Sequence, residues 1–181
     1  MNRGQMRVYF GSFRSGPMGP ALTYAFAQNL LWSTCTQLFI VIMRVERGAA
    51  VGLNHAVGSV VLGLGLPFYA VAWCLLVGVV LSLLLSLAGA RVPRRDCLRA
   101  VLYVSPAPYV VTTAMCLGPG RPQWTFFALL LAMWIARPLS YFARGRGELP
   151  DSTGHAAAFG AALVGVVLLG APLAWALGGF R

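Results

Sequence analysis

The sequence predicts an all-α fold, a polytopic membrane helical bundle of five transmembrane helices with a cytoplasmic N-terminus and an outside C-terminus. Three observations predict it: the length of the apolar stretches, the scarcity of charge and the placement of arginine. A bilayer core needs roughly 20 apolar residues per helix, and five stretches of the chain are close to that length. They cover residues 21–43, 67–90, 98–117, 124–141 and 156–177.

The composition leaves no room for a second, water-soluble domain. Hydrophobic residues make up 59% of the 181 residues and charged residues 10%, whereas a soluble domain carries roughly 25% charged residues. We therefore expect a short cytoplasmic segment over residues 1–20 and a single membrane domain over residues 21–178. The first apolar stretch ends at Arg44 without a small-residue cleavage site, which predicts a retained helix and not a signal peptide.

The placement of arginine predicts how often the chain crosses. The 43 residues from Gly48 to Ala90 carry no charge and could form one helix or two. With one helix there, ten of the 14 arginines lie on the cytoplasmic side, as the positive-inside rule requires. With two helices there, the arginine clusters at residues 91–99 and 137–146 would lie outside, against the same rule. Five spans are therefore favoured, and the use of arginine without lysine suggests a GC-rich genome and the bacterial cytoplasmic (inner) membrane.

The glycine-rich apolar lead-in at residues 48–66 allows two structures. Glycine costs a helix up to about 1 kcal/mol per site relative to alanine, which suits a re-entrant or interfacial segment. The alternative is a helical extension of the second span that is broken at Pro67. The sequence leaves both open.

Small residues recur at every fourth position along two of the predicted spans. Such a ridge lets neighbouring helix backbones approach closely. We interpret both ridges as helix-packing seams, with a pore-lining face as the alternative. In the second span the ridge consists of Ala70, Cys74, Gly78, Ser82, Ser86 and Ala90, and in the fifth span of Ala157, Ala161 and Gly165.

The first span is unusually polar. Its polar residues are Gln28, Asn29, Ser33, Thr36 and Gln37. Three of them, Asn29, Ser33 and Thr36, share one helix face because they are spaced at i, i+4 and i+7. We interpret the face as a polar interface to other helices, and a polar path or partner-binding groove is the alternative.

Arginines gather in the connections that the topology assigns to the cytoplasm. They are Arg91, Arg94, Arg95, Arg99, Arg144 and Arg146. A collar of arginine at headgroup level would bind anionic lipid or an acidic partner, with about 1 kcal/mol of attraction per residue. The alternative is that these residues only orient the chain during insertion. The net charge of +10 would suggest nucleic acid in a soluble protein. Because the arginines flank predicted membrane spans, we expect no nucleic-acid partner.

No catalytic, metal-binding or cofactor-binding pattern stands out, and we expect no enzyme, no metal and no cofactor. The acids are Glu46, Asp96, Glu148 and Asp151, all in connections or at a span end. The cysteines at 35, 74, 97 and 116 lack CxxC spacing and are interpreted as small buried thiols. In the predicted topology His55 and His155 lie near opposite membrane faces, so one monomer could not use both for a single haem.

The order of these features resembles the Yip-domain family, five-span proteins named for interacting with Ypt/Rab GTPases, and in particular its compact bacterial members. The resemblance rests on residues 9–14 (YFGSFR), 20–26 (PALTYAF), 85–90 (LSLAGA), 98–108 (LRAVLYVSPAP) and 152–157 (STGHAA). It includes the pair Arg99 and Tyr103, and it runs from about Val8 to Leu177. It implies five spans and does not imply catalysis.

These observations favour a non-enzymatic membrane scaffold or accessory subunit. Its expected partners are the lipid bilayer with anionic lipids, and other membrane protein subunits or further copies of itself. The alternative is a small oligomeric transporter or channel, with a polar path along the first span and along the third span, which Pro106 and Pro108 are expected to kink.

Overall fold

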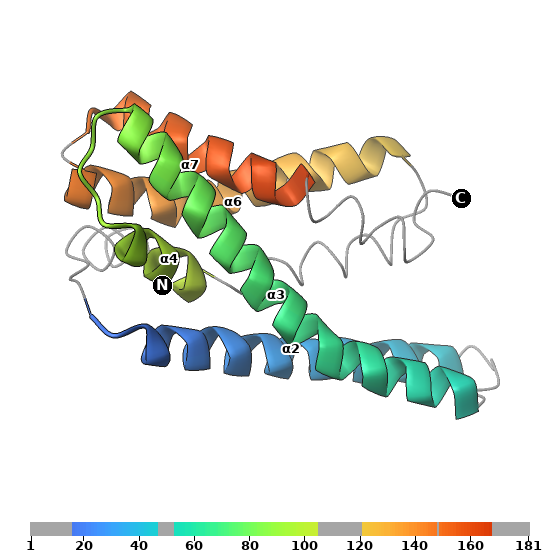
Figure 1. Ribbon diagram of the computed structural model, residues 1–181. Helices are drawn as coiled ribbons and strands as arrows, with labels where there is room; N and C mark the ends of the chain where they lie inside the picture. The colour runs from blue at the N-terminus through green and yellow to red at the C-terminus, as the bar shows by residue number, and fades with distance from the viewer. Residues whose placement is uncertain (1–15, 47–52, 105–120, 148, 168–181) are drawn as a thin grey trace.

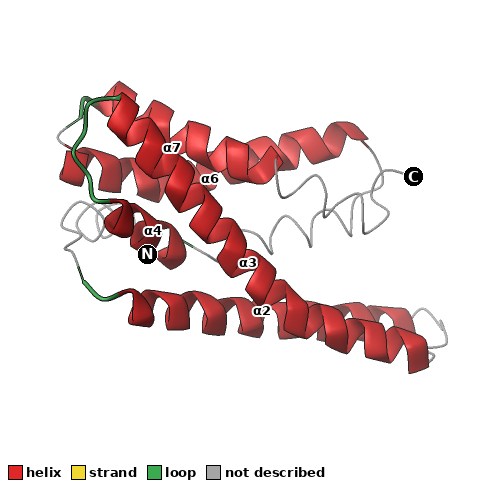
Figure 2. Ribbon diagram, in the orientation of Figure 1, coloured by secondary structure: helices red, strands yellow, loops and turns green. Residues whose placement is uncertain are grey.

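The computed structural model describes residues 16–46, 53–104, 121–147 and 149–167, and in this part of the chain the regular structure is entirely helical (Figure 2). The all-α prediction is thereby confirmed. The helices are α2 (Met18–Glu46), α3 (Leu53–Leu87), α4 (Arg94–Tyr103), α6 (Arg121–Gly147) and α7 (Asp151–Gly165).

The helix α3 is the central element of the bundle. It runs diagonally between α2 on one side and the pair α6 and α7 on the other (Figure 1), and it contacts α2, α4 and α7. At one end of the bundle, on the left of Figure 1, the starts of α2, α4 and α7 meet the ends of α3 and α6. Successive described helices thus run in alternating directions along the bundle.

The lead-in at residues 48–66 is helical from Leu53 onward, because α3 is a continuous helix of 35 residues. From Leu53 onward the helical extension is therefore found, but the break predicted at Pro67 is wrong, because the helix continues through that residue. Pro67 lies inside the helix, and Figure 1 shows α3 changing direction between its first and second halves. Proline removes a backbone donor and is the commonest cause of such a bend.

The other helices do not coincide with the predicted membrane spans, and the bounds of those spans stay predictions. The helix α4 ends at Tyr103, two residues before Ser105-Pro106, as expected where proline disfavours helix; the rest of the predicted span at 98–117 lies outside the described residues. The helix α6 is longer than the span predicted at 124–141, because it continues through Pro138 to Gly147. The helix α7 starts before the span predicted at 156–177, at Asp151, directly after Pro150.

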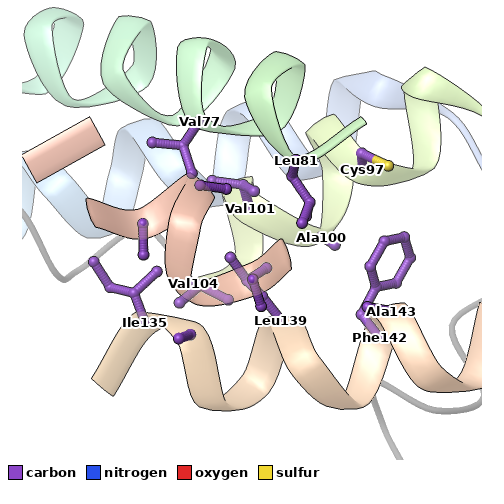
Figure 3. Close-up of a cluster of buried hydrophobic side chains, with 14 of the residues drawn as sticks. Val77, Leu81, Cys97, Ala100, Val101, Val104, Ile135, Leu139, Phe142 and Ala143 are labelled. Atoms are coloured by element: carbon purple, nitrogen blue, oxygen red, sulfur yellow. The ribbon is translucent and has the colours of Figure 1, made fainter. Parts of the chain in front are cut away.

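The hydrophobic core lies where α3, α4, α6 and α7 converge. Figure 3 shows Val77 and Leu81 of α3 facing side chains of α4 and α6, among them Val101 and Leu139. All four side chains are fully buried. The same core continues across α7 through small residues such as Ala158.

Many large apolar side chains nevertheless point outward. The most exposed include Leu31, Leu38, Ile42 and Val45 of α2, Val57, Val60, Leu64, Phe68, Leu83 and Leu87 of α3, and Met133 and Trp134 of α6. Among the described residues one helical stretch, Gly63–Leu87 with 25 residues and mean hydropathy 2.6, is long and apolar enough to cross a membrane. The other predicted crossings stay predictions.

Candidate functional site: buried and exposed charges at one end of the bundle

Asp96 is a carboxylate in the protein interior. It lies in the first turn of α4, and it is 1% exposed. An acidic residue in the first turn is favoured by the helix dipole. From the sequence Asp96 was predicted only to lie at a span end, and its burial was not foreseen.

Two arginines surround this carboxylate. One Oδ of Asp96 lies 2.5 Å from a guanidinium nitrogen of Arg146 in α6, and the other lies 3.9 Å from Arg99, one turn further along α4. We call Asp96, Arg99 and Arg146 the charged cluster. Since a lone buried charge is costly and a pair of opposite charges is tolerated, the cluster explains how α4 docks against the end of α6.

The charged cluster also reaches the start of the chain's first described helix. A side chain added at Gly16, just before α2, would come within 2.8 Å of the Arg99 guanidinium. The ring of Tyr103, one turn beyond Arg99, lies 5.3 Å from the ring of Tyr24 in α2. The short α4 therefore holds the end of α6 and the start of α2 on opposite sides.

The six arginines predicted to form one collar fall into three groups. Arg99 is buried and Arg146 is partly buried, both against Asp96. Arg144 forms an ion pair of 3.0 Å with the exposed Asp151 and lies over the ring of Tyr141. The remaining three, Arg91, Arg94 and Arg95, are exposed.

The ridge of α3 is buried over its first part and exposed at its end. Ala70, Cys74 and Gly78 are buried, Ser82 is half-buried and Ser86 is exposed. Gly78 packs directly on α4, because an added Cβ would lie 2.8 Å from the Leu98 backbone. Ser82 is hydrogen-bonded to Cys97 of α4, and Ala90, beyond the end of α3, is buried again. The ridge therefore serves contacts within this chain beyond Gly78, with Ser86 as its exposed member.

The ridge of α7 packs on α3 at its last member, Gly165. Ala157, Ala161 and Gly165 are all buried. The Trp73 indole nitrogen of α3 donates a hydrogen bond of 2.9 Å to the Gly165 carbonyl. A Cβ on Gly165 would also collide with Val77. Only a glycine allows this approach between α3 and α7.

The polar face of α2 is turned toward α3. Asn29 and Ser33 are fully buried, Gln28 and Gln37 are half-buried, and the side chain of Thr36 lies outside the described residues. The Ser33 hydroxyl donates a hydrogen bond of 2.9 Å to the Gly63 carbonyl. Asn29 donates to the Ala25 carbonyl of its own helix, while its buried Oδ1 accepts no hydrogen bond from the described residues.

A serine and a histidine also lie close together between α6 and α7. The Oγ of buried Ser140 is 3.4 Å from Nε2 of His155, whose Nδ1 faces the Asp151 carbonyl. The serine hydroxyl donates instead to the Arg137 carbonyl, at 2.7 Å. With its proton directed into its own helix, Ser140 is not placed as a nucleophile activated by the histidine.

The cysteines of the described residues differ in exposure. Cys74 and Cys97 are buried, but Cys35 is exposed, which corrects the prediction of uniformly buried thiols. The pKa of Cys97 is raised to about 12, mainly by burial; a hydrogen bond with Ser82 opposes the shift and the Asp96 carboxylate adds to it. The described residues contain no group of three side chains suited to a metal ion.

Comparisons with protein-family models, curated proteins and solved structures found no match. The likeness to the Yip-domain family therefore stays a resemblance, carried by the residues quoted above.

Proposed function

We propose that this chain is a five-span protein of the bacterial inner membrane that acts as a scaffold or accessory subunit for other membrane proteins. The end of the bundle that holds the charged cluster would face the cytoplasm. The observation that carries the proposal is the outward-facing apolar surface of α2 and α3, where Leu38, Val60 and Phe68 are all more than half exposed. An apolar surface of this extent marks a contact with lipid or protein.

The inward-facing features support a binding role, because the chain already uses them for its own packing. Gly78 and Gly165 are occupied by contacts within the molecule, and Ser33 is hydrogen-bonded to α3. A partner helix would therefore meet the outer faces of α2 and α3. The Yip-domain resemblance adds the expectation of protein partners.

Extraction in a mild detergent followed by native mass measurement tests this function. We expect the chain to copurify with itself or with other membrane subunits. A variant with Leu38→Ser and Ile42→Ser, both on the outer face of α2, should lose such a complex, whereas Ser86→Ala should keep it. A wild-type chain that runs only as a monomer of 19.3 kDa with bound lipid would contradict the scaffold function.

The transporter or channel alternative has one observation in its favour, the buried Oδ1 of Asn29 that accepts no hydrogen bond from the described residues. Cysteines introduced at Asn29 and Ser33 would then react with water-soluble thiol reagents in intact membranes. Protection of both positions is expected if the face only packs on α3. Reaction at both positions would favour a water-filled path.

A further inference from the structure

Three exposed arginines at the start of α4 form a surface that the charged cluster does not use. We call Arg91, Arg94 and Arg95 the arginine patch. No ion pair joins its members to a carboxylate of the described residues. The nearest acid in sequence, Asp96, is buried against Arg99 and Arg146.

The packing of α4 against α3 and α6 leaves the arginine patch on the surface. In α4 the face formed by Cys97, Ala100 and Val101 is fully buried, and Figure 3 shows it beside Leu81 of α3. The salt bridge from Asp96 to Arg146 fastens the same helix to α6. Because the apolar face and the acid of α4 are both engaged inside, its two leading arginines face solvent.

The arginine patch follows directly after the most apolar helix of the chain. The stretch Gly63–Leu87 is long enough to cross a membrane, Leu87 at its end is 84% exposed, and the chain then turns at Gly89, whose φ is +84°. Arg91 is four residues beyond Leu87. Where an exposed apolar helix end is followed so closely by exposed arginine, the boundary between hydrocarbon and headgroup lies between them.

We propose that the arginine patch binds the phosphate of anionic phospholipid headgroups in the leaflet that faces this end of the bundle. Guanidinium groups suit phosphate because they present several donors in a fixed plane. The proposal assigns this role to Arg91, Arg94 and Arg95 and excludes Arg99 and Arg146, which neutralise Asp96. It rests on the proposed membrane embedding. It commits to lipid rather than an acidic protein because the patch continues an exposed apolar helix end.

Native mass spectrometry of the full chain in a neutral detergent tests the proposal, with equimolar phosphatidylglycerol and phosphatidylcholine of the same acyl chains as probes. We expect the wild-type chain to bind phosphatidylglycerol preferentially. The double variant Arg94→Gln and Arg95→Gln should lower that preference about 10- to 30-fold, the change expected when two arginines that each contribute about 1 kcal/mol are removed.

The matched control removes the same charge elsewhere: Arg44→Gln and Arg47→Gln, which the proposed topology assigns to the opposite side of the membrane, should keep most of the preference. The patch variant should also keep the wild-type melting temperature, since both side chains are exposed. An unchanged preference in the patch variant, or an equal loss in both variants, would overturn the site. Extraction of native membranes at alkaline pH separates the two proposals, since release of the wild-type chain would contradict membrane embedding itself.

Discussion

The two halves of α3 lie in different surroundings. From Ala70 to Leu85 the helix buries Trp73, Val77 and Leu81 against its neighbours. Over residues 53–66 it runs beside α2 (Figure 1), and Val57, Val60 and Leu64 are each more than half exposed. We call residues 53–66 together with residues 30–46 of α2 the outer arm. We call the rest of α3, with α4 and the adjoining parts of α6 and α7, the packed end.

Glycine shows the difference most clearly. At Gly78, in the packed end, a single added carbon would meet the backbone of Leu98, whereas at Gly65, in the outer arm, it would meet nothing within 4 Å. The comparison teaches that apolar composition alone does not decide whether a helix face packs inside the chain or remains for lipid and partners.

The largest effect is expected at the charged cluster of the packed end. Asp96→Ala removes the buried carboxylate that Arg99 and Arg146 surround, and with it the ion pairs that join α4 to α6 and to its own next turn. We expect a loss of about 2–4 kcal/mol in the free energy of unfolding. Asp151→Ala is the control, because the Asp151 side chain is 82% exposed in its ion pair with Arg144. This substitution should cost less than about 1 kcal/mol. Unfolding in detergent measures both, and equal costs would contradict the structural role of Asp96.

The next effect compares the same substitution in the two regions. Gly78→Leu must overpack the contact with Leu98 and should cost on the order of 1–3 kcal/mol. Gly65→Leu enters open space in the outer arm and should be neutral or slightly stabilising, because leucine favours helix more than glycine does. Melting temperatures of the two variants in detergent measure this difference. A Gly78→Leu chain as stable as wild type would place that face toward lipid.

A smaller effect is expected within the outer arm, at the hydrogen bond from Ser33 to the Gly63 carbonyl. Ser33→Ala should lower stability by about 0.6–1.7 kcal/mol, the range found for hydrogen bonds between membrane helices. Thr34→Ala is the control, since its hydroxyl is exposed and bonds only to Leu30 of its own helix. If the two variants unfold alike, the Ser33 bond does not hold α2 to α3.

Much of the helical structure could be predicted from apolar length and proline. The end of α4 at Tyr103 follows from Pro106. The early start of α7 at Asp151 is also readable in principle, because an acid after Pro150 is a typical helix beginning. The helix α7 begins before the span predicted at 156–177, because the charged and polar residues at its start were assigned to a connection.

The division of the arginines could not be predicted, because it depends on which side chains meet in space. Asp96 and Arg146 are 50 residues apart, and nothing in their local sequence distinguishes Arg146 from Arg95. The residues of the two ridges were recognisable from their spacing, but the neighbours they contact were not. Which small residues pack and which face outward, as at Ser86, follows from how α3 crosses α4 and α7.

The proposed topology places the end of the bundle that holds the charged cluster toward the cytoplasm, with five spans that alternate across the inner membrane. Reporters fused to the chain after Arg95, Arg121, Arg146 or Arg181 test this topology most directly. The account predicts cytoplasmic signals after Arg95 and Arg146, and exterior signals after Arg121 and Arg181. Reporters after Arg95 and Arg121 that lie on the same side of the membrane would contradict it.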